Sequence, residues 1–553
     1  STQRVGVGNL ANGDISIVAG GSGNTASGYV STIGGGSLNT VGVITTQSGY
    51  YVFGSSIGGG SCNTISSYSA DYDSYGNTIA GGFRNVTVSS DYNGQTIGGG
   101  IRNTTTSDYS TVGGGYFNTS SCYSSTVNGG ARNTSSGFYS TVSGGYCNIS
   151  SEGYSFIGGG RNHTASGTWS TISGGYGNLA TAQISVVAGG YGSSATGCRA
   201  ATLGGQSNSA SGNWATVGGG LNNTASAGYA VVGGGIANTA NTAFATIAGG
   251  NSNASTGLYS FVGGGLSNTA GGACWSVVAG GCGNSITTCG AFIGGGNGNT
   301  VTGSGGYKGV IVGGALNSVS GWYAFIGGGY NNRICGIYSS TISGGYQNVI
   351  SAGCRGFIGG GQAHIVSGTW ASVVGGCANT ASGVMSVVAG GSGNTSGGTR
   401  SFVGGGIANS ASGYRSFIGG GASNSVSGSY ASSIVGGNAN AASSVYSFIG
   451  GGDSNSATNG RTVVAGGYNG TASGSYSSVS GGYQNVSSGS YTWSAGRRNT
   501  VSGNYSGAVG CCISATCPKT FYSHNFCATN CMWAVAYFES SDERLKNIHC
   551  RVE

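Results

Sequence analysis

Hydrophobic and polar positions recur along this chain with a period of fifteen residues. Alignment on the first Gly of each Gly-Gly pair from Gly20 to Gly481, and on Gly496 in the last repeat, gives 31 repeats. The spacing is 15 without a break from Gly99 to Gly264. Val or Ile stands two positions before that Gly in 29 of the 31 repeats. A fixed period of this kind indicates a stack of equal structural units.

A short strand is predicted before each Gly pair. Four positions before the first Gly the residue is mostly Ser or Ala, so positions −4, −2 and 0 are small, branched apolar and Gly. This alternation with period two is typical of a strand with one buried face, and branched residues favour a pleated surface. The run of four to six residues is too short for a helix.

A turn is predicted after each Gly pair. Asn stands four positions after the first Gly in 26 of the 31 repeats, and His163 and His364 take the same place, where we expect turn variants rather than ligands. Asn tolerates positive φ and bonds to nearby backbone, and stacked turns allow a ladder of Asn side chains. A second short run, as in Asn-Thr-Ala-Ser-Gly, completes the repeat. The prediction is an all-β fold, a parallel β-solenoid with one coil per 15-residue repeat.

Composition excludes several classes of protein. Among 553 residues there are 121 Gly, one Pro and only 5% charged residues, which suits neither amphipathic helices nor collagen. A free Gly/Ser linker has no reason to keep Val and Ile in phase. The net charge of +7 is scattered, so no nucleic-acid partner is expected, and no stretch of 18 apolar residues predicts membrane insertion.

The thin repeat suggests that the chain assembles with itself. Each coil offers about one branched side chain, worth about 1.5–3 kcal/mol, against about 1–2 kcal/mol of backbone entropy per ordered residue. We therefore expect the core to be completed between chains, in a homotrimeric rod. The domain prediction is an N-terminal cap or attachment segment at 1–16, repeats over 17–510 with insertions near 40–55, 64–76 and 86–95, a Cys- and aromatic-rich collar at 511–541, and the start of a further domain at 542–553.

The collar carries most of the clustered cysteines. Cys512, Cys517, His524, Cys527 and Cys531 leave three readings open, which are a zinc site, disulfides and packed thiols. Their spacing is unlike the tight pairs of common zinc sites, so no metal and no other cofactor is predicted.

Aromatic residues recur at two fixed phases of the repeat. They stand five positions before the first Gly, as at Tyr139, Trp169, Trp214 and Trp370, and two positions after it, as at Tyr146 and Tyr176. Two readings are open: the rings shield coil edges or pack between chains, or they stack against the sugar rings of a host glycan.

Two resemblances follow from these residues. The Ser/Ala-x-Val/Ile-x-Gly repeats over roughly 17–500 resemble the left-handed parallel β-roll heads of trimeric autotransporter adhesins. Ser541-Asp542-Glu543-Arg544-Leu545-Lys546-Asn547-Ile548 resembles the opening of the endosialidase-type intramolecular chaperone of phage and large-virus tail fibres, with one residue fewer before Asn547. That resemblance implies trimerisation, assisted folding and self-cleavage of the Ser541–Asp542 bond, with Ser541 as nucleophile and Lys546 as its base.

The sequence thus predicts a structural fibre or spike of a phage or large virus, on the virion surface or otherwise extracellular. Its expected partners are its own copies, other virion or filament proteins, and a host-surface glycan or receptor. The alternative is a trimeric cell-surface adhesin or extracellular filament subunit. Apart from the self-cleavage no enzymatic activity is expected, because 11 acidic residues are scattered over the chain. Ice binding is not favoured either, since the Thr column is irregular.

Overall fold

A computed structural model describes residues 3–43, 52–67, 74–89, 94–272, 274–303, 308–336 and 338–523. The chain divides into two compact units, Ser1–Gly298 and Asn299–Glu553.

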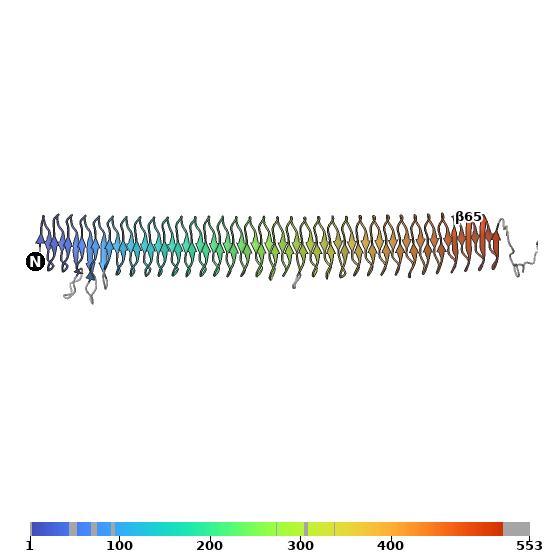
Figure 1. Cartoon of the computed structure of the whole chain (residues 1–553), viewed down its shortest axis with the longest axis horizontal. Helices are drawn as coiled ribbons and strands as arrows, with labels where there is room; N and C mark the ends of the chain where they lie inside the picture. The colour runs from blue at the N-terminus through green and yellow to red at the C-terminus, as the bar shows by residue number, and fades with distance from the viewer. Residues whose placement is uncertain are drawn as a thin grey trace, which may run out of the picture. The chain divides into compact units, whose positions relative to one another are not determined.

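In both units one repeat forms one coil, and most coils contribute a two-residue strand to each of two sheets. In the first unit β15 (Thr111–Val112) pairs with β17 (Thr126–Val127), and β16 (Thr119–Ser120) pairs with β18 (Thr134–Ser135). Both pairings are parallel, and successive coils lie side by side in chain order (Figure 1). We call the sheet of strands before the Gly pair sheet A and the other sheet B. The predicted all-β parallel β-solenoid of 15-residue repeats is confirmed.

The coils extend beyond residues 17–510 at both ends. Residues 3–16, expected to form a cap, contain β1 (Gln3–Arg4) and β2 (Leu10–Ala11), which pair with β3 (Ile17–Val18) and β4 (Thr25–Ala26). At the other end β68 (Ser514–Ala515) and β69 (Phe521–Ser523) pair with β66 (Thr500–Val501) and β67 (Gly507–Cys511). The first part of the expected collar is therefore solenoid, while 524–553 lies outside the described residues.

The first three insertions follow directly on strands of sheet B. At these insertions, the sheet B strands lengthen to four residues, in β6 (Thr40–Val43), β9 (Thr64–Ser67) and β12 (Val86–Ser89), which pair with one another in parallel. Among the described residues no helix occurs, and so none is long and apolar enough to span a membrane.

The core is closed within one chain. The second residue of each sheet A strand points inward, and Val142, Ile157 and Ile172 have no exposed surface. Sheet B adds a second inward column of mostly Ala and Ser, and where Ser faces Ser the hydroxyls bond, as in Ser135–Ser140 at 2.7 Å. The expectation that the core is completed between chains is wrong, because two sheets of the same chain already enclose the branched side chains.

The Asn column forms the predicted ladder inside the turns. The Asn118 Nδ2 donates to the Gly114 carbonyl at 2.8 Å and to the Gly130 carbonyl of the next coil at 2.9 Å. The backbone N–H of Asn118 donates to the Asn103 Oδ1 at 3.0 Å. The positive φ predicted for Asn belongs instead to the residue before it, such as Phe117 at 56°.

The second Gly of the pair is required by the close approach of coils. Gly130 has φ +84°, and a Cβ there would lie 2.2 Å from the Gly145 carbonyl oxygen and 2.6 Å from the Asn133 Nδ2. Both contacts are shorter than van der Waals separation, so a side chain would displace the Asn ladder.

Candidate functional site

Aromatic side chains line one edge of the coils, at the turn that leads from sheet B into sheet A. We call positions −6 and −5 relative to the first Gly the aromatic edge. The residue at −5 has positive φ, as in Tyr154 (59°) and Trp169 (64°). This conformation is costly for a bulky residue. It is held here by hydrogen bonds between coils, since the Trp169 N–H donates to the Gly153 carbonyl at 2.9 Å.

The rings on this edge stack from coil to coil. In the first unit Tyr154 lies between Tyr139 (ring centroids 5.4 Å apart) and Trp169 (4.1 Å), with planes within 14° and 4°. A second run continues the pattern with centroids 4.6–6.2 Å apart: Trp214, Tyr229, Phe244, Tyr259 and Trp275. All these rings are solvent-exposed, and Trp275, at 64%, is the most exposed of them. The edge is a row of parallel rings at the pitch of the coils.

Arginine side chains lie over several of these rings. The Arg199 guanidinium is 4.4 Å from the Trp214 ring centroid, and that of Arg355 is 5.3 Å from Trp370 in the second unit. Such pairs are stabilised by attraction between the cation and the ring face. We did not predict these Arg residues as site residues, although they occupy the same −5 position as the aromatics, which is the signal that could have identified them.

The remaining predicted candidates lie on the opposite edge, at the Gly-Gly turn. Arg161 stands between Tyr146 and Tyr176, at 5.1 and 5.7 Å from their centroids, and Tyr176 stacks on Tyr191 at 5.1 Å. The six predicted glycan-binding residues are therefore not brought into one site. Tyr139, Trp169 and Trp214 share the aromatic edge of the first unit, Trp370 lies on that edge of the second, and Tyr146 and Tyr176 lie on the other edge.

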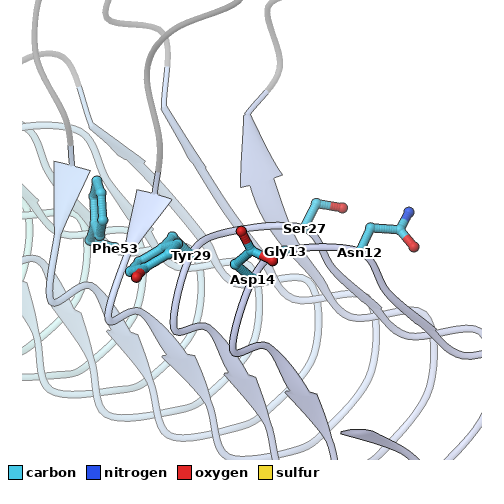
Figure 2. Close-up of a pocket in the computed structure, with 6 residues that line it drawn as sticks. All are labelled: Asn12, Gly13, Asp14, Ser27, Tyr29 and Phe53. Carbon is cyan, nitrogen blue, oxygen red and sulfur yellow. The ribbon is translucent and has the colours of Figure 1, made fainter. Parts of the chain in front are cut away.

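A shallow hollow on the aromatic edge of the first unit adds residues that sequence reasoning missed. It is lined by Asn12, Gly13, Asp14, Ser27, Tyr29 and Phe53 (Figure 2). Tyr29 and Phe53 meet edge to face, with centroids 4.9 Å apart, and Asp14 is exposed beside them. A carboxylate and amide beside aromatic rings combine hydrogen bonding with an apolar platform. The residues that line this hollow come from three coils, so no local sequence motif indicates them.

The two histidines are buried members of the Asn ladder. His163 Nδ1 accepts the Asn178 N–H at 3.1 Å, in place of the usual Asn oxygen, and His364 does the same for Asn379 at 3.0 Å. Burial lowers the pKa of both imidazoles, which opposes the weaker raising effect of the backbone hydrogen bonds. As predicted, they are turn variants.

The predicted cleavage residues Ser541, Asp542 and Lys546 lie outside the described residues, as do His524, Cys527 and Cys531. Within the described ranges no three His, Cys, Asp or Glu side chains are grouped so as to hold a metal ion. All 13 cysteines there are free thiols, and the Sγ atoms of Cys274 and Cys289 on adjacent coils are 3.4 Å apart.

No protein-family model and no curated protein matches the sequence of this chain.

Proposed function

We propose that this protein is a structural attachment fibre whose aromatic edge binds carbohydrate at a host surface. The solenoid supplies a regular scaffold and the edge presents exposed rings on successive coils. Sugars offer C–H faces that stack on aromatic rings, while Arg and Tyr side chains donate hydrogen bonds to sugar hydroxyls. The observation that carries the proposal is the stacked, exposed row of rings that ends at Trp169.

Trp169 is the best-placed ring in this row. A ring within a stack has both of its faces covered by neighbouring rings. A ring at the end of a run has only one face covered by another ring. Trp169 stacks on Tyr154, and the following coil carries Ile184 at the same position. Its indole is half exposed and provides a larger platform than the Tyr rings.

The test is binding of the full chain to an array of oligosaccharides and polysaccharides, followed by titration of the best ligand. Trp169→Ala is expected to weaken binding about three- to tenfold, the value of one stacking contact. Ile236→Ala is the matched control, since it removes an exposed apolar side chain from the opposite edge of the first unit and should bind like the unaltered protein. Absence of binding to any sugar, or equal loss in both variants, would contradict the proposal.

The viral assignment belongs to this proposal and is supported by the run from Ser541 to Ile548. In it the Lys546 amine takes the Ser541 hydroxyl proton, which activates the oxygen for cleavage of the Ser541–Asp542 bond. Intact-mass measurement of the complete gene product should find a fragment that ends at Ser541, and Ser541→Ala should abolish it. An unchanged fragment in the variant would remove Ser541 as nucleophile and leave the adhesin or filament alternative.

Self-association, with a homotrimer as the expected state, is also part of the proposed function. Since the core is closed within one chain, such an assembly needs a contact surface on the outside of the coils.

A further inference from the structure

The outer surface of sheet A in the second unit is unusually apolar. The first residue of each strand points outward while the second is buried, as in β53 (Phe402–Val403) and β55 (Phe417–Ile418). We call the phenylalanine face the set of outward residues at this position: Val310, Phe325, Thr341, Phe357, Ser372, Val387, Phe402, Phe417, Ser433, Phe448 and Val463. Five of these eleven positions hold Phe.

Each Phe on this face is matched by a Gly two residues later. At Gly327, Gly359, Gly404 and Gly419 the ring Cε1 of the preceding Phe lies 3.4–3.5 Å from the place where a Cβ would stand. The rings therefore lean over bare backbone rather than stand upright. Successive rings also stack, since the Phe402 and Phe417 centroids are 5.6 Å apart with planes within 6°.

Where the strand begins with a small residue, the position two residues later is larger. Ser372 is followed by Val374 and Ser433 by Val435, and these two Val side chains are about half exposed. In these two coils the larger side chain therefore stands at the second outward position instead of the first. The result is an uneven relief of rings, Val side chains and gaps along the face.

Two columns of side chains point outward from sheet A in this stretch, the first residue of each strand and the residue two positions later. Neither column contains a charged residue between Val310 and Ala465. The outward columns of sheet B in the same stretch are rich in Ser and Thr, as in β50 (Thr380–Ala381), β52 (Thr395–Ser396) and β54 (Ser410–Ala411). The apolar character is therefore much stronger on sheet A, since Val349 and Ile365 are the branched apolar residues at these outward positions of sheet B. It is a property of the side chains and not of the strand geometry, which both sheets share.

The exposed area matches what a stable interface requires. Phe325, Phe357, Phe417 and Phe448 each keep 37–39% of their surface exposed. With about 200 Å² for a whole Phe side chain, the rings and the Val side chains expose on the order of 800 Å² of apolar surface. This is about the area that each partner buries in an interface of standard size, and it exceeds the largest apolar patch of a typical monomer.

We propose that the phenylalanine face is the surface through which a second copy of this chain binds, each copy using the same face. A second copy has the same coil pitch and the same relief, so side chains of one face can pack into the gaps of the other, as an isologous contact requires. The lack of charge lets two copies of a chain of net charge +7 meet there without repulsion between like charges. This inference concerns the pairing of two copies, which is what an isologous face gives, so it depends neither on the homotrimer nor on the carbohydrate binding of the proposed function.

The experiment is sedimentation velocity of the full chain and of its Phe402→Thr/Phe417→Thr variant. Thr341 already occupies an equivalent position, so the sheet accommodates Thr there. The unaltered protein is expected to sediment above the 53.7 kDa of one chain, and the variant to dissociate at concentrations about tenfold higher or more. The matched control is Thr380→Ala/Thr395→Ala on sheet B, which should leave the assembly unchanged.

Two results would overturn the proposal: a single chain at about 50 µM unaltered protein, or an assembly that persists unchanged in the Phe402→Thr/Phe417→Thr variant. Phe325→Thr/Phe357→Thr is a second variant of the same face if the first does not fold by far-UV circular dichroism. Carbohydrate binding measured on the same variant separates the two proposals, because Trp169 lies in the first unit on an edge of the coil.

Discussion

At the scale of single residues, the unusual feature is a polar column inside a thin core. A buried amide or hydroxyl costs free energy unless it is hydrogen-bonded. Asn118 satisfies its amide with two Gly carbonyls and its oxygen with the next Asn N–H. Many buried Ser hydroxyls bond to one another or to backbone, as in Ser135 and Ser140, whereas those of Ser16, Ser170, Ser386 and Ser477 have no partner. The column therefore fixes the turn of each coil relative to the next one. This also explains why Asn is four residues after the first Gly, where its Nδ2 reaches that Gly's carbonyl.

The two histidines make this column sensitive to pH. An imidazole can accept the Asn178 or Asn379 N–H only while Nδ1 carries no proton, and its Nε2 has no hydrogen-bond partner. Burial lowers the folded pKa below the ordinary 6.5, so below that pH the unfolded chain binds protons that the folded chain does not. Stability from these groups is complete above pH 6.5 and is lost as the pH falls towards the folded pKa.

We expect the thermal midpoint to fall from pH 7.5 to pH 5.5 by about 1–3 °C more in the unaltered protein than in His163→Asn/His364→Asn. Far-UV circular dichroism melts at the two values measure this. His524 and His549 are present in both proteins and serve as an internal control. An equal fall in both proteins would show that the ladder histidines are not responsible.

At the scale of the element, the coil is the unit of structure and contacts its neighbours through both sheets. Each strand pairs in parallel with the equivalent strand one coil away, as Thr126–Val127 pairs with Thr141–Val142. Stability in such a stack is approximately a sum over coils and the interfaces between them. Strands of two residues suffice because hydrogen bonds between coils continue through both turns.

This arrangement predicts that a whole coil can be removed. Deletion of residues 130–144 joins Gly129 to Gly145 in register, and we expect the melting midpoint to stay within about 2 °C. Deletion of residues 130–137 removes only the sheet B half of a coil, which places a sheet A sequence against sheet B and should lower the midpoint strongly. Similar melts for the two deletions would contradict the coil as the cooperative unit.

At the scale of the whole molecule, the coil presents different chemistry on its edges and faces. Its aromatic edge carries stacked rings and arginines, sheet B carries hydroxyls, and sheet A in the second unit carries phenylalanine. Attachment and self-association are therefore proposed for separate surfaces, which lets both occur in one assembly. Attachment and self-association can each be disrupted by substitution of an outward side chain, such as Trp169 or Phe402, without any change to the buried columns.

The sequence by itself determined the repeat, the strand before each Gly pair, the turn and the parallel solenoid, because these depend on local periodicity that every coil repeats. It also located the exposed aromatic phases. Only the tertiary structure decided that the core closes within one chain, because the inward Ala and Ser of sheet B are too small to read as a buried column. Likewise, only the structure showed Arg199 over Trp214, Asp14 beside Tyr29, and Phe402 over Gly404 on an uncharged face, since which columns face outward together depends on how the coil closes.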